Sequence, residues 1–269
     1  MTAKRVTTPD LMQMKRDGRK IVAVTAYDFT FARLLDQAGV DLLLVGDSLG
    51  MVVQGHDTTL PVTLDEMIYH TRAVARGAAR ALVVCDLPFG CYHVGPEAAL
   101  ASAVRAMKES GAHAVKLEGG ETMAASVRFL VERGIPVIGH VGLTPQSVHA
   151  FGGFRIQGRN EASARRIIAD AELLAEAGAG AVVLEGIPAS LATTISERLP
   201  IPTIGIGAGS GCDGQVLVLY DLLGLYEGIK PRFVKEFMSG GEQVRQAVGQ
   251  YAREVRDGSF PGAEHSFGG

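Results

Sequence analysis

Residues 42–47 read Leu-Leu-Leu-Val-Gly-Asp, a short apolar run that ends on a carboxylate. The pattern returns four more times along the chain, where an acid or a histidine closes the run: Asp86, Glu118, His140 and Glu185. A charged group at the end of a buried strand is costly unless a ligand, a metal or a partner meets it. If the strands are parallel, these side chains lie at one edge of one sheet, and the pattern indicates an enzyme site.

Eight such runs have the length and β-branched content of buried strands. They begin at Ile21, Asp41, Ala81, Ala112, Ile135, Ala181, Ile201 and Gln215. The runs are nearly continuous rather than alternating, which is typical of strands covered on both faces. With helices between them, they predict an α/β fold, a (β/α)8 TIM barrel, and a doubly wound open sheet is the main alternative.

Helix start and stop signals occupy most of the gaps between these runs. Thr8 is the expected cap of an N-terminal helix with Pro9 in its first turn. The segment Thr63-Leu64-Asp65-Glu66 is a capping box that opens a helix toward Gly77. Further helices are expected from Pro96 to Gly111, up to Gly134, up to Gly178, after Pro188 and over residues 242–257, the last followed by a flexible tail.

Length and composition fit one barrel domain over residues 1–269, because such barrels need about 250 residues. Lys and Arg number 26 against 29 Asp and Glu, a net charge of −3 that shows no bias toward nucleic acid or anionic membranes. No segment is long enough to span a bilayer, and the N-terminus lacks the apolar region of a secretory signal. Three cysteines without metal-ligand spacing favour a reduced, cytoplasmic setting.

Asp47 and Asp86 close the second and third runs, which are neighbours in either architecture. Two carboxylates at adjacent strand ends repel each other unless a cation or a proton lies between them. Oxygen ligands of this kind suit Mg²⁺, and Glu118 at the next strand end is a candidate third ligand, direct or through water. The alternative is that the aspartates cap the turns that follow them.

Lys116 lies two residues before Glu118, so both side chains point to the same face of their strand. In a barrel that face is the interior, where a lysine needs an anion, either a substrate carboxylate or an acid of the chain itself. Glu185 at the sixth strand end is a candidate general base, with a capping or ion-paired acid as the alternative. His140 is a possible accessory group that orients a ligand or shuttles protons.

Two connections are long and rich in glycine, residues 46–62 and 142–159. Loops of this size in a compact domain are often lids or binding loops, and surface excursions are the alternative. We expect both to lie near the site.

Residues 46–49, Gly-Asp-Ser-Leu, match the tetrapeptide that gives the GDSL serine hydrolases their name. Those enzymes also need an Asp-x-x-His motif, and this chain has none. Without that base the serine has no activating partner of the expected kind, so the hydrolase reading is disfavoured.

Residues 205–209, Gly-Ile-Gly-Ala-Gly, are similar to the phosphate-binding turn of many barrels. A tight loop that approaches other backbone explains the same glycines equally well. A small-molecule or phosphate-binding barrel without catalysis therefore remains an alternative function.

Longer motifs resemble one family, the ketopantoate hydroxymethyltransferases. Residues 25–78 are similar to its N-terminal signature almost throughout, and further matching stretches follow: residues 85–120 (with CDLPFG and KLEGG), 137–147 (VIGHVGLTPQS), 182–188 (VVLEGIP) and 204–224 (IGIGAGSGCDGQVLVLYDLLG). The resemblance covers nearly the whole chain except its first residues and its C-terminal tail. Cys91 and Tyr220 depart from it, because the family commonly has serine and histidine there.

The resemblance implies roles for particular residues. Asp47 and Asp86 correspond to Mg²⁺ ligands, Glu118 to a third ligand, and Glu185 to the proton acceptor. The implied contacts of the 2-oxoacid are Asp47, Ser48, Asp86 and Lys116.

The resemblance also implies a reaction and an assembly. A hydroxymethyl group passes from 5,10-methylenetetrahydrofolate to 3-methyl-2-oxobutanoate, giving 2-dehydropantoate (ketopantoate) for pantothenate biosynthesis, in a cytoplasmic transferase that is often a homodecamer. The closest rival is a Mg²⁺-dependent C–C lyase or phosphomutase of 2-oxoacids, which would use a similar barrel without a folate.

Overall fold

The computed structural model describes residues 4–228 and 230–267. The chain divides into two compact units, Met1–Val218 and Leu219–Gly269. All eight strands belong to the first unit. The assignment of residues 1–269 to a single domain therefore stays a prediction.

The strands of the first unit form a closed, parallel barrel in which each strand pairs with the next and β8 pairs with β1. They are β1 (Ile21–Thr25), β2 (Leu42–Val45), β3 (Leu82–Asp86), β4 (Ala114–Lys116), β5 (Val137–Gly142), β6 (Ala181–Glu185), β7 (Thr203–Ile206) and β8 (Gly214–Leu217). Each lies within a predicted run, except that β8 begins one residue before its run and β5 ends one residue after its run. The barrel is confirmed, and the open doubly wound sheet is excluded because β1 and β8 are hydrogen-bonded.

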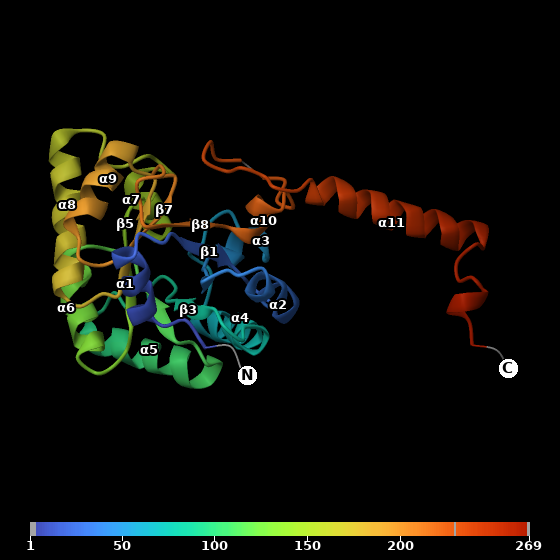
Figure 1. The fold of residues 1–269 in the computed structure, drawn as a ribbon, viewed down its shortest axis with the longest axis horizontal. Helices are drawn as coiled ribbons and strands as arrows, with labels where there is room; N and C mark the ends of the chain where they lie inside the picture. The colour runs from blue at the N-terminus through green and yellow to red at the C-terminus, as the bar shows by residue number, and fades with distance from the viewer. Residues whose placement is uncertain (1–3, 229, 268–269) are drawn as a thin grey trace. The chain divides into compact units, whose positions relative to one another are not determined.

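Helices lie between successive strands, except between β7 and β8, and surround the barrel (Figure 1). They are α1 (Thr8–Arg16), α2 (Phe29–Gln37), α3 (Leu49–Val52), α4 (Leu64–Gly77), α5 (Pro96–Ser110), α6 (Glu121–Val131), α7 (Val148–Phe151), α8 (Glu161–Glu176) and α9 (Ala189–Arg198), with a 3₁₀ turn, η1 (Pro145–Ser147), before α7. The long loop 142–159 therefore contains two short helical segments, and loop 46–62 contains α3.

Helix ends follow local chemistry, with one correction. The predicted box at Thr63 is confirmed, because its hydroxyl accepts from the Glu66 N–H and the Glu66 carboxylate accepts from the Thr63 N–H. The cap of α1 is Thr7, so the prediction of Thr8 is wrong. Asp10 stands three residues after Thr7 and completes a reciprocal pair with it, which shifts the start of the helix by one residue.

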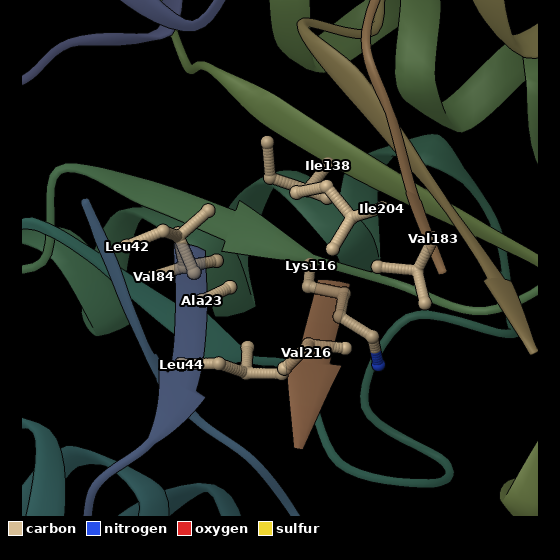
Figure 2. Close-up of a pocket in the computed structure, with 9 residues that line it drawn as sticks. All are labelled: Ala23, Leu42, Leu44, Val84, Lys116, Ile138, Val183, Ile204 and Val216. Carbon is tan, nitrogen blue, oxygen red and sulfur yellow. The ribbon is translucent and has the colours of Figure 1, made fainter. Parts of the chain in front are cut away.

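The barrel interior is packed with apolar side chains and one charged one. Figure 2 shows the residues that line its small central cavity: Ala23, Leu42, Leu44, Val84, Lys116, Ile138, Val183, Ile204 and Val216. Because side chains alternate along a strand, the inward series of β3 continues from Leu82 and Val84 to Asp86. The interior thus changes from apolar to charged at the carboxyl ends of the strands.

The second unit contains α10 (Leu219–Leu222), α11 (Gly240–Asp257) and a 3₁₀ turn, η2 (Ala263–His265). The C-terminal helix is confirmed, and Gly258 ends it in the left-handed conformation. Of the predicted flexible tail, Gly268 and Gly269 lie outside the described residues. Within residues 4–228 and 230–267, no helix combines the length and apolar character needed to cross a membrane.

Candidate active site

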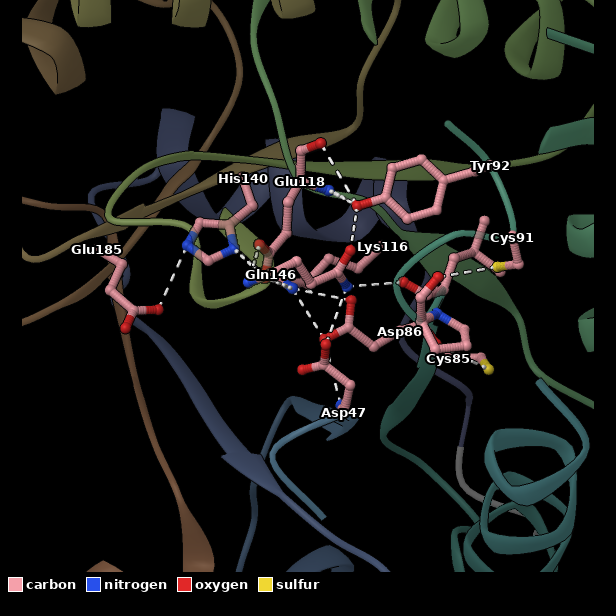
Figure 3. A network of polar contacts seen from close by, with 12 residues as sticks. Asp47, Cys85, Asp86, Cys91, Tyr92, Lys116, Glu118, His140, Gln146 and Glu185 are labelled. Atoms are coloured by element: carbon pink, nitrogen blue, oxygen red, sulfur yellow. Dashed lines mark hydrogen bonds and ion pairs between the residues drawn. The ribbon is translucent and has the colours of Figure 1, made fainter. Parts of the chain in front are cut away.

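The acids predicted from separate strands meet at the carboxyl end of the barrel (Figure 3). Asp47 follows β2 and Asp86 ends β3, and the Asp47 N–H lies 3.5 Å from Oδ2 of Asp86. Both side chains are buried. The two aspartates are therefore close enough to act on one ligand, as their strand order predicted.

Lys116 faces the barrel interior, as the spacing to Glu118 predicted. Its ammonium nitrogen lies 2.8 Å from both carboxylate oxygens of Asp86 and 3.7 Å from Oε1 of Glu118. The intramolecular ion pair that the sequence left open is thus present. Burial lowers the pKa of this lysine, but Asp86, Glu118 and Asp47 outweigh it and raise the pKa above its usual value, so the ammonium form persists.

Burial and mutual repulsion disfavour the ionised form of two of these acids. The pKa of Asp47 is raised well above its usual value by burial first, and then by the charges of Asp86 and Glu118. The pKa of Asp86 is also raised by burial, which the charge of Lys116 opposes. A positive charge placed beside these two aspartates would therefore favour their ionised forms.

His140 stands between two glutamates. Its Nδ1 lies 3.4 Å from Oε1 of Glu118 and its Nε2 lies 3.3 Å from Oε2 of Glu185, distances typical of ion pairs, although neither nitrogen is aligned for a hydrogen bond. Burial and Lys116 lower the pKa of His140, but the two glutamates outweigh them and raise it to about 9. Burial by itself raises the pKa of Glu118, but His140 and Lys116 outweigh burial and lower this pKa below its usual value.

Glu185, the last residue of β6, is the most accessible acid of the group. Its side chain is 17% exposed, against 3% for Glu118 and for Asp86. A ligand that enters the barrel mouth can reach this carboxylate, while His140 holds it from the buried side. That position suits a group that exchanges a proton with a bound substrate.

Ser48 lies beside Asp47 at the start of α3, where its Oγ is 2.9 Å from the hydroxyl of Tyr27. In the part of the chain that the structure describes, no imidazole contacts this serine. The hydrolase reading of residues 46–49 therefore gains no support from the fold.

Two further polar residues belong to the site and were not predicted, Gln146 and Tyr92. Both are buried, and the Tyr92 hydroxyl donates to Oε1 of Gln146 at 2.6 Å. Gln146 comes from η1 in the long loop that follows β5, so the expectation that this loop approaches the site is confirmed. The length of the loop indicated that it approaches the site. A glutamine or a tyrosine in the sequence does not by itself indicate which groups it will bind.

The donor chemistry of the cluster fits a hard divalent cation such as Mg²⁺. Its ligands would be carboxylate oxygens, and Oε1 of Glu118 is buried without a hydrogen-bond partner. Within residues 4–228 and 230–267, no three acidic, histidine or cysteine side chains form a ready metal cage. In this arrangement Lys116 supplies the countercharge at Asp86 instead.

The glycines after β7 have a packing explanation. A Cβ on Gly209 would collide with Ala189 of α9, and one on Gly211 would collide with the Thr193 hydroxyl. Gly209 also has φ +78°, which disfavours any side chain. Close approach of the turn to α9 thus accounts for Gly209 and for Gly211 without a phosphate ligand.

Of the two departures from the family pattern, Cys91 is half-buried in the connection between β3 and α5. Its thiol donates to the Pro88 carbonyl at 3.1 Å, and burial raises its pKa to about 11. Tyr220 lies on α10 in the second unit.

A closed parallel barrel with acids, a lysine and a histidine at the carboxyl ends of its strands defines a (β/α)8 enzyme. Solved structures share this fold. The chain superposes on a phosphonopyruvate hydrolase with a TM-score of 0.62 over 98% of this chain and 92% of that one, at 15% identity. It superposes on 2,3-dimethylmalate lyase with a TM-score of 0.60 over 97% and 91%, at 17% identity. At such identities the likeness concerns the fold alone.

Sequence comparison identifies the family. The family model for ketopantoate hydroxymethyltransferase matches residues 5–263, and the chain belongs to this family. A 3-methyl-2-oxobutanoate hydroxymethyltransferase of Magnetococcus marinus is 67% identical over 98% of both chains. The enzyme of the same name from Heliobacterium modesticaldum is 55% identical over 99% of this chain and 96% of its own.

Proposed function

We propose that this chain transfers a hydroxymethyl group from 5,10-methylenetetrahydrofolate to 3-methyl-2-oxobutanoate, giving ketopantoate for pantothenate biosynthesis. Family membership supports the reaction. The observation that carries it is the meeting of Asp47, Asp86 and Glu118 around Lys116 at the barrel mouth, with Glu185 joined to Glu118 through His140. A 2-oxoacid needs both a positive centre for its carboxylate and a base near its C3 proton.

Asp47, Asp86 and Glu118 are the residues that would hold Mg²⁺, with the third acting directly or through water. When bound, this ion supplies a Lewis acid that stabilises negative charge on the oxygen of the oxoacid. Lys116 and Ser48 contribute a cation and a hydroxyl for the substrate carboxylate. In this proposal Asp47 and Asp86 contact the oxoacid as well as the ion.

Glu185 removes the proton from C3 of the oxoacid, since its partly exposed carboxylate is the most accessible acid of the group. The electron pair left on C3 then forms a bond to the folate-borne methylene carbon. One of the two carbon–nitrogen bonds of this methylene breaks as the carbon–carbon bond forms, and water displaces the second nitrogen and supplies the hydroxyl. The two folate nitrogens take up the proton from C3 and one proton of the water, so tetrahydrofolate leaves. His140 is an accessory group here, since it lies against Glu185 and holds that carboxylate in place.

Two experiments test the proposal. With 3-methyl-2-oxobutanoate and methylenetetrahydrofolate, the protein should release tetrahydrofolate in the presence of Mg²⁺ and not after chelation. A lyase or phosphomutase would instead convert its substrate without a folate, and a binding barrel without catalysis would release nothing.

The second experiment tests Glu185. Without folate, the enzyme should exchange the C3 proton of the oxoacid with D₂O. Glu185→Gln should largely abolish this exchange while oxoacid binding remains, and the exposed Glu176→Gln should behave as the wild type. Unchanged exchange in Glu185→Gln would remove Glu185 from its role as the base.

We also propose that the chain is cytoplasmic and assembles into a homo-oligomer, a decamer by family resemblance. Free Cys85, Cys91 and Cys212 support a reducing compartment. Val244, Val248, Tyr251 and Val255 recur at helical spacing along α11, which supports packing of this helix against another surface. Light scattering on the purified protein tests the assembly, and a monomer would contradict it.

A further inference from the structure

Gln146 makes four hydrogen bonds within the carboxylate cluster. Its side-chain Nε2 donates to Oδ2 of Asp47 at 2.9 Å and to the Leu87 carbonyl at 3.0 Å. Its Oε1 accepts from the Tyr92 hydroxyl at 2.6 Å, and its backbone N–H donates to Oε2 of Glu118 at 3.0 Å. One buried residue of the loop after β5 thus contacts acids that follow β2 and β4 (Figure 3).

The chemistry of its neighbours fixes the direction of the Gln146 amide. The Leu87 carbonyl can only accept, so it requires the NH₂ group on its side, and the second N–H of that group points to Oδ2 of Asp47. Tyr92 holds the other side, since its hydroxyl accepts the Glu118 N–H at 3.1 Å and therefore directs its single proton to Oε1. A flipped amide would place three acceptor oxygens together, a costly arrangement at a buried position.

The same contacts divide each of two carboxylates into an oxygen that accepts a hydrogen bond and one that does not. In Glu118, Oε2 accepts from Gln146, whereas Oε1 accepts no hydrogen bond and faces only the cations His140, at 3.4 Å, and Lys116, at 3.7 Å. In Asp47, Oδ2 accepts from Gln146, and among the described residues no hydrogen bond is made to Oδ1. Both oxygens without a hydrogen bond belong to proposed Mg²⁺ ligands.

We propose that Gln146 is a positioning residue, which together with Tyr92 holds one oxygen of Asp47 and one of Glu118 so that the other oxygens face the cation. This inference rests on the proposed function, because it assigns a purpose to these carboxylates. It adds a residue of the β5–α8 loop to the metal site, and it does not assign Gln146 any contact with substrate.

The test is the affinity for Mn²⁺, measured by calorimetry on the full chain in the presence of 3-methyl-2-oxobutanoate. Gln146→Met keeps the length of the side chain and removes its hydrogen bonds. Loss of a group that orients metal ligands typically weakens metal binding about 10–100-fold, and we expect this range. Gln157→Met is the matched control, because Gln157 lies on the same loop and its side chain donates only to the Arg155 carbonyl among the described residues.

Tyr92→Phe provides a second and gentler variant, since the ring stays and only the hydroxyl is lost. We expect Tyr92→Phe to lose less Mn²⁺ affinity than Gln146→Met does. The double variant should bind Mn²⁺ as tightly as Gln146→Met alone, because both residues act through the same hydrogen bonds. With Mg²⁺ saturating, kcat should fall much less than the metal affinity. Thermal unfolding without metal shows whether each variant is folded. If Gln146→Met does not fold, the Mn²⁺ affinity of Tyr92→Phe tests the inference.

The outcomes separate this inference from the function on which it rests. Mn²⁺ affinity within about twofold of the wild type in both Gln146→Met and Tyr92→Phe would overturn the inference, since positioning effects are larger than that. A wild-type protein that binds no Mn²⁺ with the oxoacid would instead overturn the proposed metal site itself.

Discussion

The ammonium group of Lys116 lies 2.8 Å from both carboxylate oxygens of Asp86, and both side chains are buried at the base of the barrel mouth. These are residues of neighbouring strands that stand opposite each other in the register of β3 and β4. The charges of Asp47 and Glu118 also act on Lys116 and help to raise its pKa. The ion pair thus joins the carboxyl ends of β3 and β4 without a bound ligand.

Lys116→Met should strongly destabilise the protein, because Asp86 is left as a buried charge without its partner. Removing one member of a buried pair costs about 3–5 kcal/mol of unfolding free energy. Urea unfolding measures the effect, and Lys116→Met with Asp86→Asn should recover part of the loss without restoring oxoacid binding. A loss below about 1 kcal/mol in the single variant would contradict a structural role for the pair.

Asp47→Asn should make the metal-free protein more stable and the loaded protein less so. Burial and the charges of Asp86 and Glu118 disfavour the ionised Asp47 carboxylate, so a neutral side chain removes both the cost of burying this charge and its repulsion. Thermal unfolding should then show a higher midpoint without ligand and little further rise with Mg²⁺ and oxoacid. Exposed Asp57→Asn, in the same connection between β2 and α4, should keep the wild-type response.

His113 should make stability depend on pH on the acid side. Its Nδ1 accepts the Val83 N–H, and burial first, then the charge of Arg5, lowers its pKa from 6.5 to about 4. Between these values the unfolded chain binds a proton that the folded chain refuses, so the free energy of unfolding falls as pH decreases from 6.5 to 4. Because the ring is partly exposed, we expect a fall on the order of 1 kcal/mol from this residue.

Urea unfolding at a series of pH values tests this dependence. His113→Asn keeps an acceptor for the Val83 N–H but cannot titrate, so its unfolding free energy should fall less between pH 6.5 and 4 than that of the wild type. The exposed His149→Asn serves as the control. Identical curves for His113→Asn and the wild type would refute the assignment.

Gly211→Ala should destabilise the turn between β7 and β8 by about 1–3 kcal/mol, because the new methyl group overlaps the Thr193 hydroxyl on α9. Adding Thr193→Ala removes that hydroxyl and should restore part of the stability. Thermal unfolding of the two single variants and the double variant measures the coupling. Additive effects would show that the glycine is not required by this contact.

The strands and most helix ends could be predicted because their signals are local. Eight apolar runs, the Thr63 box and Gly111 after α5 each act within a few residues of the chain. The start of α1 was misplaced by one residue, because Asp10 and not the proline selects the cap. Helix α2 was not singled out, although its start carries a local signal, because the Asp28 side chain accepts from the Phe31 N–H.

The nature of the site residues followed from the strand ends, but their partners did not. Lys116 could be expected to meet an anion, yet the choice of Asp86 over Glu118 depends on the register of β3 with β4. His140 was expected as an accessory group, and only the fold places it between two glutamates. Gln146 and Tyr92 carried no recognisable signal, because an amide or a phenol gains its role from what surrounds it.

Local patterns along the chain were therefore enough for the eight strands, the α/β class and the set of acids at the strand ends, whereas the choice of a closed barrel over an open sheet depends on the pairing of β1 with β8. This is because strand burial, helix capping and side-chain alternation depend on residues close in sequence. Closure of the barrel decided which oxygen accepts each hydrogen bond and which charged groups lie next to each acid. Those relations join residues as far apart as Asp47 and Gln146, and they exist only once the strands are in register and water is excluded from between them.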